Sequence, residues 1–460
     1  MPQPAAEWRE LLASGRLVPF IVLCLGVWLH AADSFLAATT MPAAVEEIGG
    51  VAFINWAIAL YLLGAIVSGA AVGVMARRLG LRNVLIIAAA VYAFGCAVSA
   101  IAPDIGVLLV GRLIQGAGGG VMIALTYVAT QRLFPERLWV RLMAIVSAIW
   151  GASSLCGPMI GGAFADAGLW RGAFWAFGAQ ALLLIVVARI WLNDLPAEKR
   201  EAMSWPWRPL LVLAIGTLAI AAAGDTGAPQ WSALLGLIGV LALYAAARID
   251  FAGPVRLMPA ELLRPWHPVG AGLLMVLALA AGTAAFASYG PLLLELLFGV
   301  SPLVAGYILA AESVAWTLGT LATSGFPPAA DRLLIRGGAS VIGIGGVGLV
   351  AFVARGPLSL IVVSVALQGL GYGICWPYIV RRIVIAAAPG ERDLAASATS
   401  SMQRIGYALG ASASGIAANA AGLGEGTGRA VAEAAGFSVF ASFLPVLAFG
   451  FVAAWQLTRR

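Results

Sequence analysis

Length, composition and charge place this chain in a membrane. Its 460 residues are 62% hydrophobic and only 10% charged, with a mean hydropathy of +0.96. Water-soluble globular proteins do not have this composition, so a soluble enzyme or a soluble binding domain is excluded. The net charge of +6 is explained by membrane topology and predicts no nucleic-acid partner.

Apolar runs recur along the whole chain, from Leu17 to Leu457. Each is close to the length of about 20 residues that crosses about 30 Å of hydrocarbon as a helix. The pattern predicts an all-α polytopic membrane protein with about fourteen helices. The expected spans are 17–41, 53–75, 83–102, 105–130, 139–165, 172–191, 209–224, 231–247, 268–290, 303–324, 334–354, 358–379, 394–418 and 436–457.

The loops between these spans divide the basic residues unequally. One face collects nearly all of them, whereas the other face holds only Arg171, Arg355 and Arg429. By the positive-inside rule the basic face is cytoplasmic, and an even number of spans puts both termini there. The sequence therefore predicts a multi-pass protein of the cell membrane, such as a bacterial inner membrane, with cytoplasmic termini.

Polar segments divide the chain into three parts. The longest runs from Asn193 to Arg208, and a second follows from Arg248 to Pro268. We predict an N-terminal six-helix bundle (1–192), an inserted two-helix segment with cytoplasmic linkers (193–267) and a C-terminal six-helix bundle (268–460). Two halves with corresponding basic loops are typical of proteins built from repeats around a central site.

One arginine stands inside an apolar, glycine-rich span. Arg112 is followed by Gln115 and by Gly116, Gly118, Gly119 and Gly120. A guanidinium is expensive to bury in lipid and indicates a functional site. Farther on, a second pattern of small residues and proline predicts close helix packing and bending. Its members are Gly151, Gly157, Pro158, Gly161 and Gly162.

These patterns resemble motifs of the major facilitator superfamily. Residues 73–82 look like its loop motif G-x-x-x-D-[RK]-x-G-x-[RK], and residues 112–118 its R-x-x-Q-G-x-G. Residues 157–162 look like the antiporter motif G-P-x-x-G-G. Asp33 through Pro42 keeps the spacing of D-x-T-x-x-N-x-x-L-P, a pattern of the fourteen-helix drug:proton antiporter branch. Phe35, Ala38 and Met41 replace the threonine, asparagine and leucine of that pattern.

The resemblance implies a major facilitator fold and a cytoplasmic gate. The gate residues carried over from the loop motif are Gly73, Arg77, Arg78, Gly80 and Arg82. Arg77 stands where the family has an acid. Because Glu391 and Asp393 precede a predicted helix, we expect Arg77 or Arg78 to approach one of them when the cytoplasmic side is closed.

Proton coupling requires a group whose charge changes during the cycle. Arginine does not titrate usefully, so Arg112 is expected to tune a carboxylate. The intramembrane acids are Asp33 and Glu312, and Glu312 could instead pair with Arg404. His30 lies one helical turn before Asp33, where it could pass protons or, as is common for a lone histidine, serve as a hydrogen-bonded packing residue.

Aromatic residues in the second half are candidates for a substrate cavity. Trp316, Trp376 and Tyr378 offer surface for apolar or cationic organic compounds, and packing between helices is the alternative. The four cysteines lie within apolar spans and are read as packing residues. No metal or cofactor is predicted.

The sequence thus predicts a secondary active transporter rather than an enzyme. It lacks a phosphate-binding G-x-x-x-x-G-K-[ST] and the hydrolase patterns H-E-x-x-H and G-x-S-x-G. The expected function is proton-coupled efflux of drug-like or amphipathic organic compounds by alternating access. The expected partners are a small-molecule substrate, protons and the lipid bilayer, and the expected state is monomeric. The alternatives are a proton-coupled permease for a metabolite or siderophore and a non-transporting membrane sensor or scaffold.

Overall fold

The protein folds into helices throughout the described chain. The computed structural model describes residues 17–50, 53–192, 205–226, 228–423 and 428–459, so the polar segment expected from Asn193 lies largely outside it. The α-helices are α2 (Leu17–Ile48), α3 (Ile54–Ala70), α4 (Val72–Ala100), α5 (Ile105–Leu133), α6 (Glu136–Asp166), α7 (Trp170–Trp191), α8 (Trp207–Ala223), α9 (Pro229–Ala252), α10 (Pro268–Phe298), α11 (Pro302–Thr323), α12 (Asp331–Phe352), α13 (Leu358–Ala386), α14 (Arg392–Ala420), α15 (Arg429–Ala441) and α16 (Leu444–Leu457).

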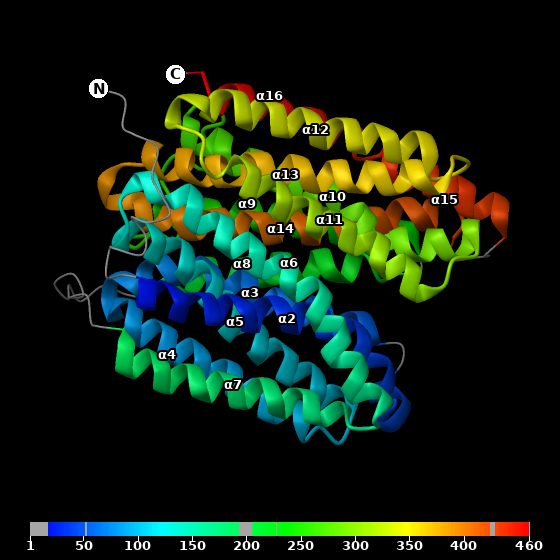
Figure 1. Cartoon of the computed structure of the whole chain (residues 1–460), viewed down its shortest axis with the longest axis horizontal. Helices are drawn as coiled ribbons and strands as arrows, with labels where there is room; N and C mark the ends of the chain where they lie inside the picture. The colour runs from blue at the N-terminus through cyan, green and yellow to red at the C-terminus, as the bar shows by residue number, and fades with distance from the viewer. Residues whose placement is uncertain (1–16, 51–52, 193–204, 227, 424–427, 460) are drawn as a thin grey trace.

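Two lobes of helices lie side by side, with their long axes roughly parallel (Figure 1). Helices α2 to α7 form one lobe and α10 to α16 the other, and we call them the N lobe and the C lobe. The α8–α9 pair packs chiefly on itself, and α8 also contacts α3 and α14. The start of α2 and the end of α16 lie at the same end of the molecule.

Eleven segments of the described chain are long and apolar enough to cross a membrane. Helices α3 and α8 are apolar but have 17 residues each, which gives about 26 Å at 1.5 Å per residue. Helix α14 has 29 residues but is rich in serine and alanine, and its polar residues are buried against other helices. Each expected span overlaps a helix, but the expected count of fourteen membrane crossings is not confirmed.

The structure departs from the expected boundaries at two places. Residues 76–82 were expected as a loop, but they are helical except for a turn at Gly80, where φ is +77° and only glycine fits without strain. The last expected span is divided between α15 and α16. Pro445 stands in the first turn of α16, where proline is tolerated and an uninterrupted helix is not favoured.

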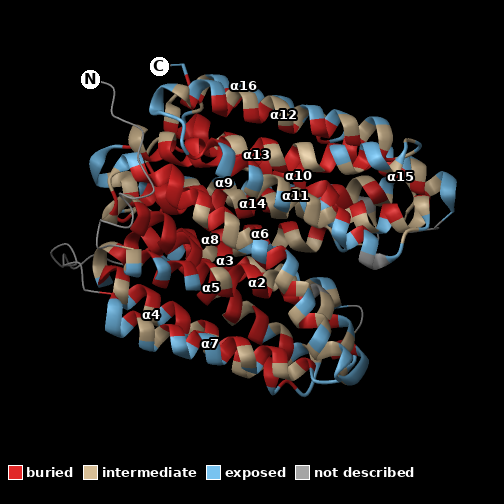
Figure 2. Ribbon diagram, in the orientation of Figure 1, coloured by how far each residue is buried: buried red, intermediate tan, exposed pale blue. Residues whose placement is uncertain are grey.

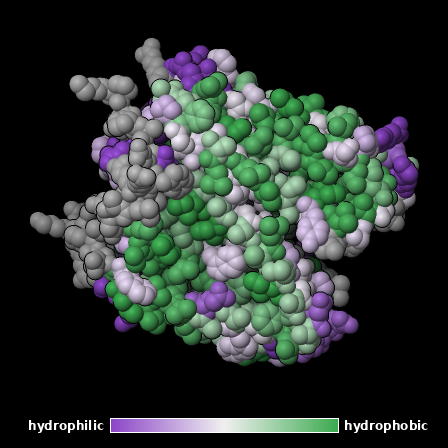
Figure 3. All heavy atoms as spheres, viewed as in Figure 1, coloured by the Kyte–Doolittle hydropathy of each residue, from purple (hydrophilic) through white to green (hydrophobic). Residues whose placement is uncertain are grey.

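The distribution of polarity fits a membrane-spanning bundle. Buried residues concentrate along the interior faces of the helices (Figure 2). Hydrophobic residues cover the sides of the molecule and hydrophilic ones gather toward its two ends (Figure 3). Large apolar side chains therefore face outward along α7, where Leu183 and Ile190 are 61% and 62% exposed. In lipid these exposed side chains incur no hydrophobic penalty.

Small residues set the contact between α2 and α6. A Cβ added at Gly157 would lie 2.8 Å from the carbonyl oxygen of Ala32, and one at Gly161 would lie 2.9 Å from that of Leu36. A Cβ at Gly162 would meet no heavy atom within 4 Å. The close packing expected of the glycine motif therefore depends on Gly157 and Gly161, and Gly162 does not take part in it.

Gly161→Ala and Gly162→Ala form a matched pair for testing this packing. We expect Gly161→Ala to destabilise the N lobe by about 1–3 kcal/mol, because the added methyl group forces α2 away from α6. Gly162→Ala should leave stability within about 0.5 kcal/mol. Thermal unfolding in detergent measures both, and equal melting temperatures for the two variants would contradict the assignment.

Candidate functional site

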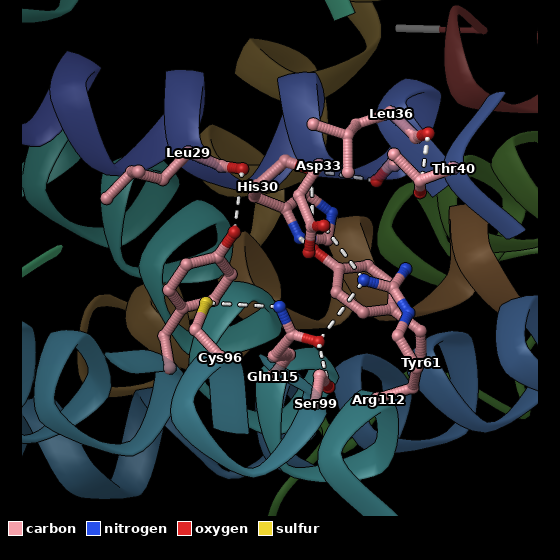
Figure 4. A network of polar contacts seen from close by, with 12 residues as sticks. Leu29, His30, Asp33, Leu36, Thr40, Tyr61, Cys96, Ser99, Arg112 and Gln115 are labelled. Carbon is pink, nitrogen blue, oxygen red and sulfur yellow. Dashed lines mark hydrogen bonds and ion pairs between the residues drawn. The ribbon is translucent and has the colours of Figure 1, made fainter. Parts of the chain in front are cut away.

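A buried ion pair joins α2 to α5 in the middle of the N lobe (Figure 4). A guanidinium nitrogen of Arg112 lies 2.8 Å from Oδ1 of Asp33, and both side chains are 1% exposed. Oδ2 of Asp33 and Nε of Arg112 have no hydrogen-bond partner among the residues that the structure describes. Such a pair is costly to desolvate, so its energy is sensitive to the loss of either charge.

A second set of contacts fixes the position of Arg112. The same guanidinium nitrogen donates to Oε1 of Gln115 at 3.3 Å, and that amide is held by Ser99 and Cys96 of α4. The guanidinium also lies over the ring of Tyr61 on α3, 4.4 Å from its centroid. Three helices of the N lobe therefore orient one cation.

The polar network continues from Tyr61 into the C lobe. The Tyr61 hydroxyl lies 2.8 Å from Nδ1 of His30 on α2, and Nε2 of His30 lies 3.1 Å from a guanidinium nitrogen of Arg404 on α14. Arg404 also donates to the Ser400 hydroxyl at 2.7 Å. Arg404 thus pairs with His30 rather than with Glu312, the acid that was the alternative partner in the sequence.

Glycines of α5 make room for this network. A Cβ at Gly116 would lie 1.9 Å from the carbonyl oxygen of Tyr61, and one at Gly120 would lie 2.3 Å from the main chain of Ala65. A Cβ at Gly119 would lie 2.6 Å from Nδ1 of His30. The glycine-rich run after Arg112 therefore brings α3 against α5 and leaves space for the His30 ring.

Glu312 lies on α11 of the C lobe, apart from Asp33. It is half-buried and has no hydrogen-bond or ion-pair partner among the described residues. Trp316, one helical turn farther on, stacks on Tyr372 with 4.5 Å between ring centroids, and its indole Nε1 is buried without a partner. Glu312 and the Trp316 indole thus offer unused polar groups on one face of α11.

The other two candidate aromatic residues are packed more deeply. Trp376 is 3% exposed and lies edge-on to Trp316 at 6.0 Å. Tyr378 is fully buried, and its hydroxyl donates to the carbonyl oxygen of Thr323. Of the three, Trp316 is the one that keeps part of its surface accessible.

Charged residues tie the lobes together at the end of the molecule that holds the start of α2, which we call the basic end. Arg132 and Gln131, in the last turn of α5, both bond the carboxylate of Asp393 at the start of α14. Arg256 lies 3.1 Å from Glu391, which also accepts from the main-chain N–H of Ala260 at 2.9 Å. These acids are therefore neutralised by Arg132 and Arg256, which the motif did not single out.

The residues of the loop motif surround the same contact. A Cβ at Gly73 would lie 2.9 Å from Leu394 and 3.1 Å from the carbonyl oxygen of Asp393. The Arg78 guanidinium lies 5.8 Å from the ring centroid of Trp205, which precedes α8. The approach of Arg77 or Arg78 to these acids remains a prediction.

A hydrogen bond from Thr317 marks the contact between α6 and α11 near the middle of the molecule. The Thr317 hydroxyl donates to the carbonyl oxygen of Ser147 at 3.1 Å, and Gly151 leaves room for it because a Cβ there would lie 2.3 Å from Thr317 Oγ1. At the end opposite the basic end, the surface is indented between the lobes (Figure 3). The lobes are thus closed at the basic end.

Comparison with known proteins agrees with this architecture. The family model described as "Major Facilitator Superfamily" matches residues 23–411. The chain belongs to the major facilitator superfamily. Its members are transporters rather than enzymes. The predicted family and the prediction of a transporter instead of an enzyme are therefore confirmed.

Several relatives in this superfamily are multidrug transporters. The chain is 32% identical to a "Probable multidrug-efflux transporter" of Mycobacterium tuberculosis, over 100% of this chain and 99% of that protein. It is 24% identical to a multidrug efflux pump of Staphylococcus aureus, over 65% and 67% of the two chains. Among solved structures, a human organic anion transporter aligns with a TM-score of 0.68 at 16% identity, over 96% and 99% of the chains. A proton:xylose symporter aligns at 0.67 and 17%, over 96% and 95%.

For this superfamily member we expect the Asp33–Arg112 pair to show strong energetic coupling. Asp33→Asn or Arg112→Gln alone should destabilise the protein by about 3–5 kcal/mol, because each leaves an unpaired charge in the interior. The double variant should cost less than the sum of the single changes. Thermal unfolding of all four proteins tests this, and additive losses would show that the two charges do not interact.

The closure of the basic end can be tested by exchanging charges. Arg132→Asp alone should weaken closure because it places two carboxylates together, and adding Asp393→Arg should restore it in part. Cysteine cross-linking across the basic end, with Arg256→Gln as a control at a separate pair, measures closure. Equal cross-linking in the single and double variants would reject the role of the Arg132–Asp393 pair.

Proposed function

We propose that this superfamily member is a proton-coupled efflux transporter for amphipathic organic cations that works by alternating access. The observation that carries the proposal is the continuous polar chain Asp33–Arg112–Tyr61–His30–Arg404, which joins the two lobes through the interior. The sequence similarity to multidrug-efflux proteins supports it. A proton that changes one member of this chain changes the contact between the lobes.

Asp33 is the proposed carrier of the coupled proton. Its Oδ2 has no partner, whereas its Oδ1 holds Arg112, so a proton can bind Oδ2 without displacing another group. Once Asp33 is neutral, the guanidinium loses its counter-charge and its preferred position changes. Arg112 stays charged throughout, so protonation of Asp33 leaves an uncompensated positive charge in the interior. The groups around Arg112 must then rearrange to stabilise it.

Glu312 and Trp316 form the proposed contact with a cationic substrate. A carboxylate without a protein partner attracts an organic cation, and the aromatic pair Trp316–Tyr372 beside it supplies apolar surface for the rest of the molecule. The unpartnered indole N–H of Trp316 can donate to a polar atom of the same ligand. An organic cation bound there supplies the counter-charge that Glu312 lacks among the described residues.

The topology that goes with this function follows from the sequence. We propose fourteen membrane crossings, with α3, α8 and α14 added to the eleven long apolar segments. The bundles 1–192 and 268–460 are the moving halves, and 193–267 is the inserted segment. The basic end is cytoplasmic, both termini lie there, and the transporter acts as a monomer in the cell inner membrane.

Transport by the purified full chain in proteoliposomes tests the proposed function. Vesicles with an acidic interior should accumulate tetraphenylphosphonium as protons leave, and a protonophore should abolish the accumulation. Binding of the probe without accumulation would indicate a membrane sensor or scaffold. Gradient-driven uptake of a polar metabolite or siderophore, with none of the cation, would indicate a permease.

Glu312→Gln should weaken this transport selectively. We expect the variant to lose about tenfold or more in apparent affinity for tetraphenylphosphonium, because the amide removes the charge that attracts the cation while preserving shape. Glu295→Gln, which changes an acid near the end of α10, is the matched control and should transport normally. Unchanged affinity in Glu312→Gln would remove Glu312 from the substrate site.

A further inference from the structure

His30 has a defined hydrogen-bonding role in this conformation. A guanidinium carries donors and no acceptor, so the 3.1 Å contact from Arg404 requires a lone pair on Nε2 of His30. A neutral imidazole with its lone pair on Nε2 carries its proton on Nδ1. Nδ1–H then donates to the Tyr61 oxygen at 2.8 Å.

The second contact of Tyr61 agrees with this tautomer. The Tyr61 hydroxyl is 3.3 Å from the main-chain carbonyl oxygen of His30, to which it can only donate. Its oxygen therefore remains free to accept from Nδ1–H. Both hydrogen bonds of the His30 ring and both of the Tyr61 hydroxyl are satisfied together, which assigns the neutral Nδ1–H form.

The surroundings hold the ring in place. His30 is 2% exposed, stacks on Tyr61 with 5.4 Å between centroids, and meets Trp150 of α6 edge-on at 5.8 Å. Gly119 of α5 lies against its Nδ1 edge. The ring therefore cannot turn away from Arg404 without moving Tyr61 or Trp150.

The charged and titratable groups around His30 come from several helices. Arg404 approaches from α14, Arg112 acts on it from α5, and Tyr61 bonds it from α3. On α2 itself, Asp33 compensates Arg112. On α4, the Tyr92 hydroxyl donates to the neighbouring carbonyl oxygen of Leu29 at 3.4 Å, and from α6 the uncharged Trp150 contacts the ring. The interaction between Arg404 and His30 thus depends on the lone pair of His30 Nε2.

We propose that His30 is a proton-operated latch between the lobes and a second proton-binding residue of the transport cycle. In its neutral form, Nε2 accepts from Arg404 and holds α14 against α2 while the basic end is closed. A proton bound at Nε2 removes the acceptor and sets N–H against N–H, so the latch opens. This inference rests on the proposed proton coupling and adds the residue that converts proton binding into lobe separation.

The position of the latch gives the direction of the switch. Arg404 lies twelve residues after the start of α14, about 18 Å along its axis from the basic end, and the lobes are closed between these two levels. Releasing Arg404 therefore removes a contact that favours the closed basic end. Protonation of His30 shifts the equilibrium toward a state open at that end.

Nitrogen-15 spectroscopy of the full chain tests the tautomer. The chain contains two histidines, so labelling histidine in His267→Asn leaves His30 as the only source of ring signals. Asparagine can still cap α10, where His267 now accepts from the Val269 N–H. We expect a protonated Nδ1 and a bare Nε2 in the closed state. The opposite tautomer, or a doubly protonated ring in that state, would overturn the latch.

Distance measurements test the coupling to lobe separation. Spin labels at the exposed positions Leu79 of α4 and Leu333 of α12, in a Cys156→Ser background, report the opening of the basic end. In otherwise unchanged protein the open-to-closed ratio should rise about ten- to hundred-fold as the pH is lowered far enough to protonate His30, as expected for the loss of a charge-assisted hydrogen bond.

Two substitutions of His30 separate titration from packing. His30→Gln keeps an acceptor for Arg404 and a donor for Tyr61 but does not titrate, so it should stay closed as pH falls. His30→Ala, and independently Arg404→Met, should favour the open state at every pH. A His30→Gln protein that opens with the pH dependence of the parent protein would refute the latch. That result would reject only the latch and would not bear on the proposed function. Absent transport by the unmodified chain, with a retained His30-dependent opening, would reject only the proposed function.

Discussion

The ion pair between Asp33 and Arg112 is the constraint on which the rest of the site depends. A guanidinium in the membrane interior requires a counter-charge and further acceptors, and α2, α3 and α5 each contribute a group that contacts it, while Ser99 of α4 holds Gln115 in place. The glycines of α5 follow from this need, because they let the backbone of α3 approach closely enough for Tyr61 to lie under the cation. The pair thus constrains the packing of the N lobe and is the place where we propose that a proton binds.

Helix α14 is the part of the C lobe that contacts this site. It contacts α3, α4 and α5 as well as α8 and α10. Its sequence is only weakly apolar, and its polar residues are buried against these helices. Arg404 donates to His30 in the interior, and Asp393 pairs with Arg132 at the basic end. Two contacts at different depths therefore hold the same helix. A transporter that alternates between two closures needs contacts of this modest and reversible kind.

The helical fold and the residues of the ion pair could be predicted from the sequence, because helices in lipid must be largely apolar. Arg112, Asp33 and the helix-packing glycines stand out since charges and glycines are unusual in apolar helices. The partners of Asp393 and Glu391 could not be predicted, because Arg132 and Arg256 look like ordinary members of a basic face. Likewise, the sequence places His30 one turn from Asp33 but cannot show that Arg404, 374 residues away, meets its other nitrogen. Gly162 matches the motif, yet only the packing shows that it faces open space.

The central proposal is exchange of an organic cation for a proton, and this exchange requires that binding of the cation and protonation of the interior network exclude each other. Proton release from the detergent-solubilised full chain tests it most directly, because tetraphenylphosphonium carries no titratable proton and any proton released must come from the protein. The account predicts that adding the cation at fixed pH releases protons from the unmodified chain, and that Asp33→Asn releases fewer. Cation binding without proton release, or equal release from Asp33→Asn, would contradict the account.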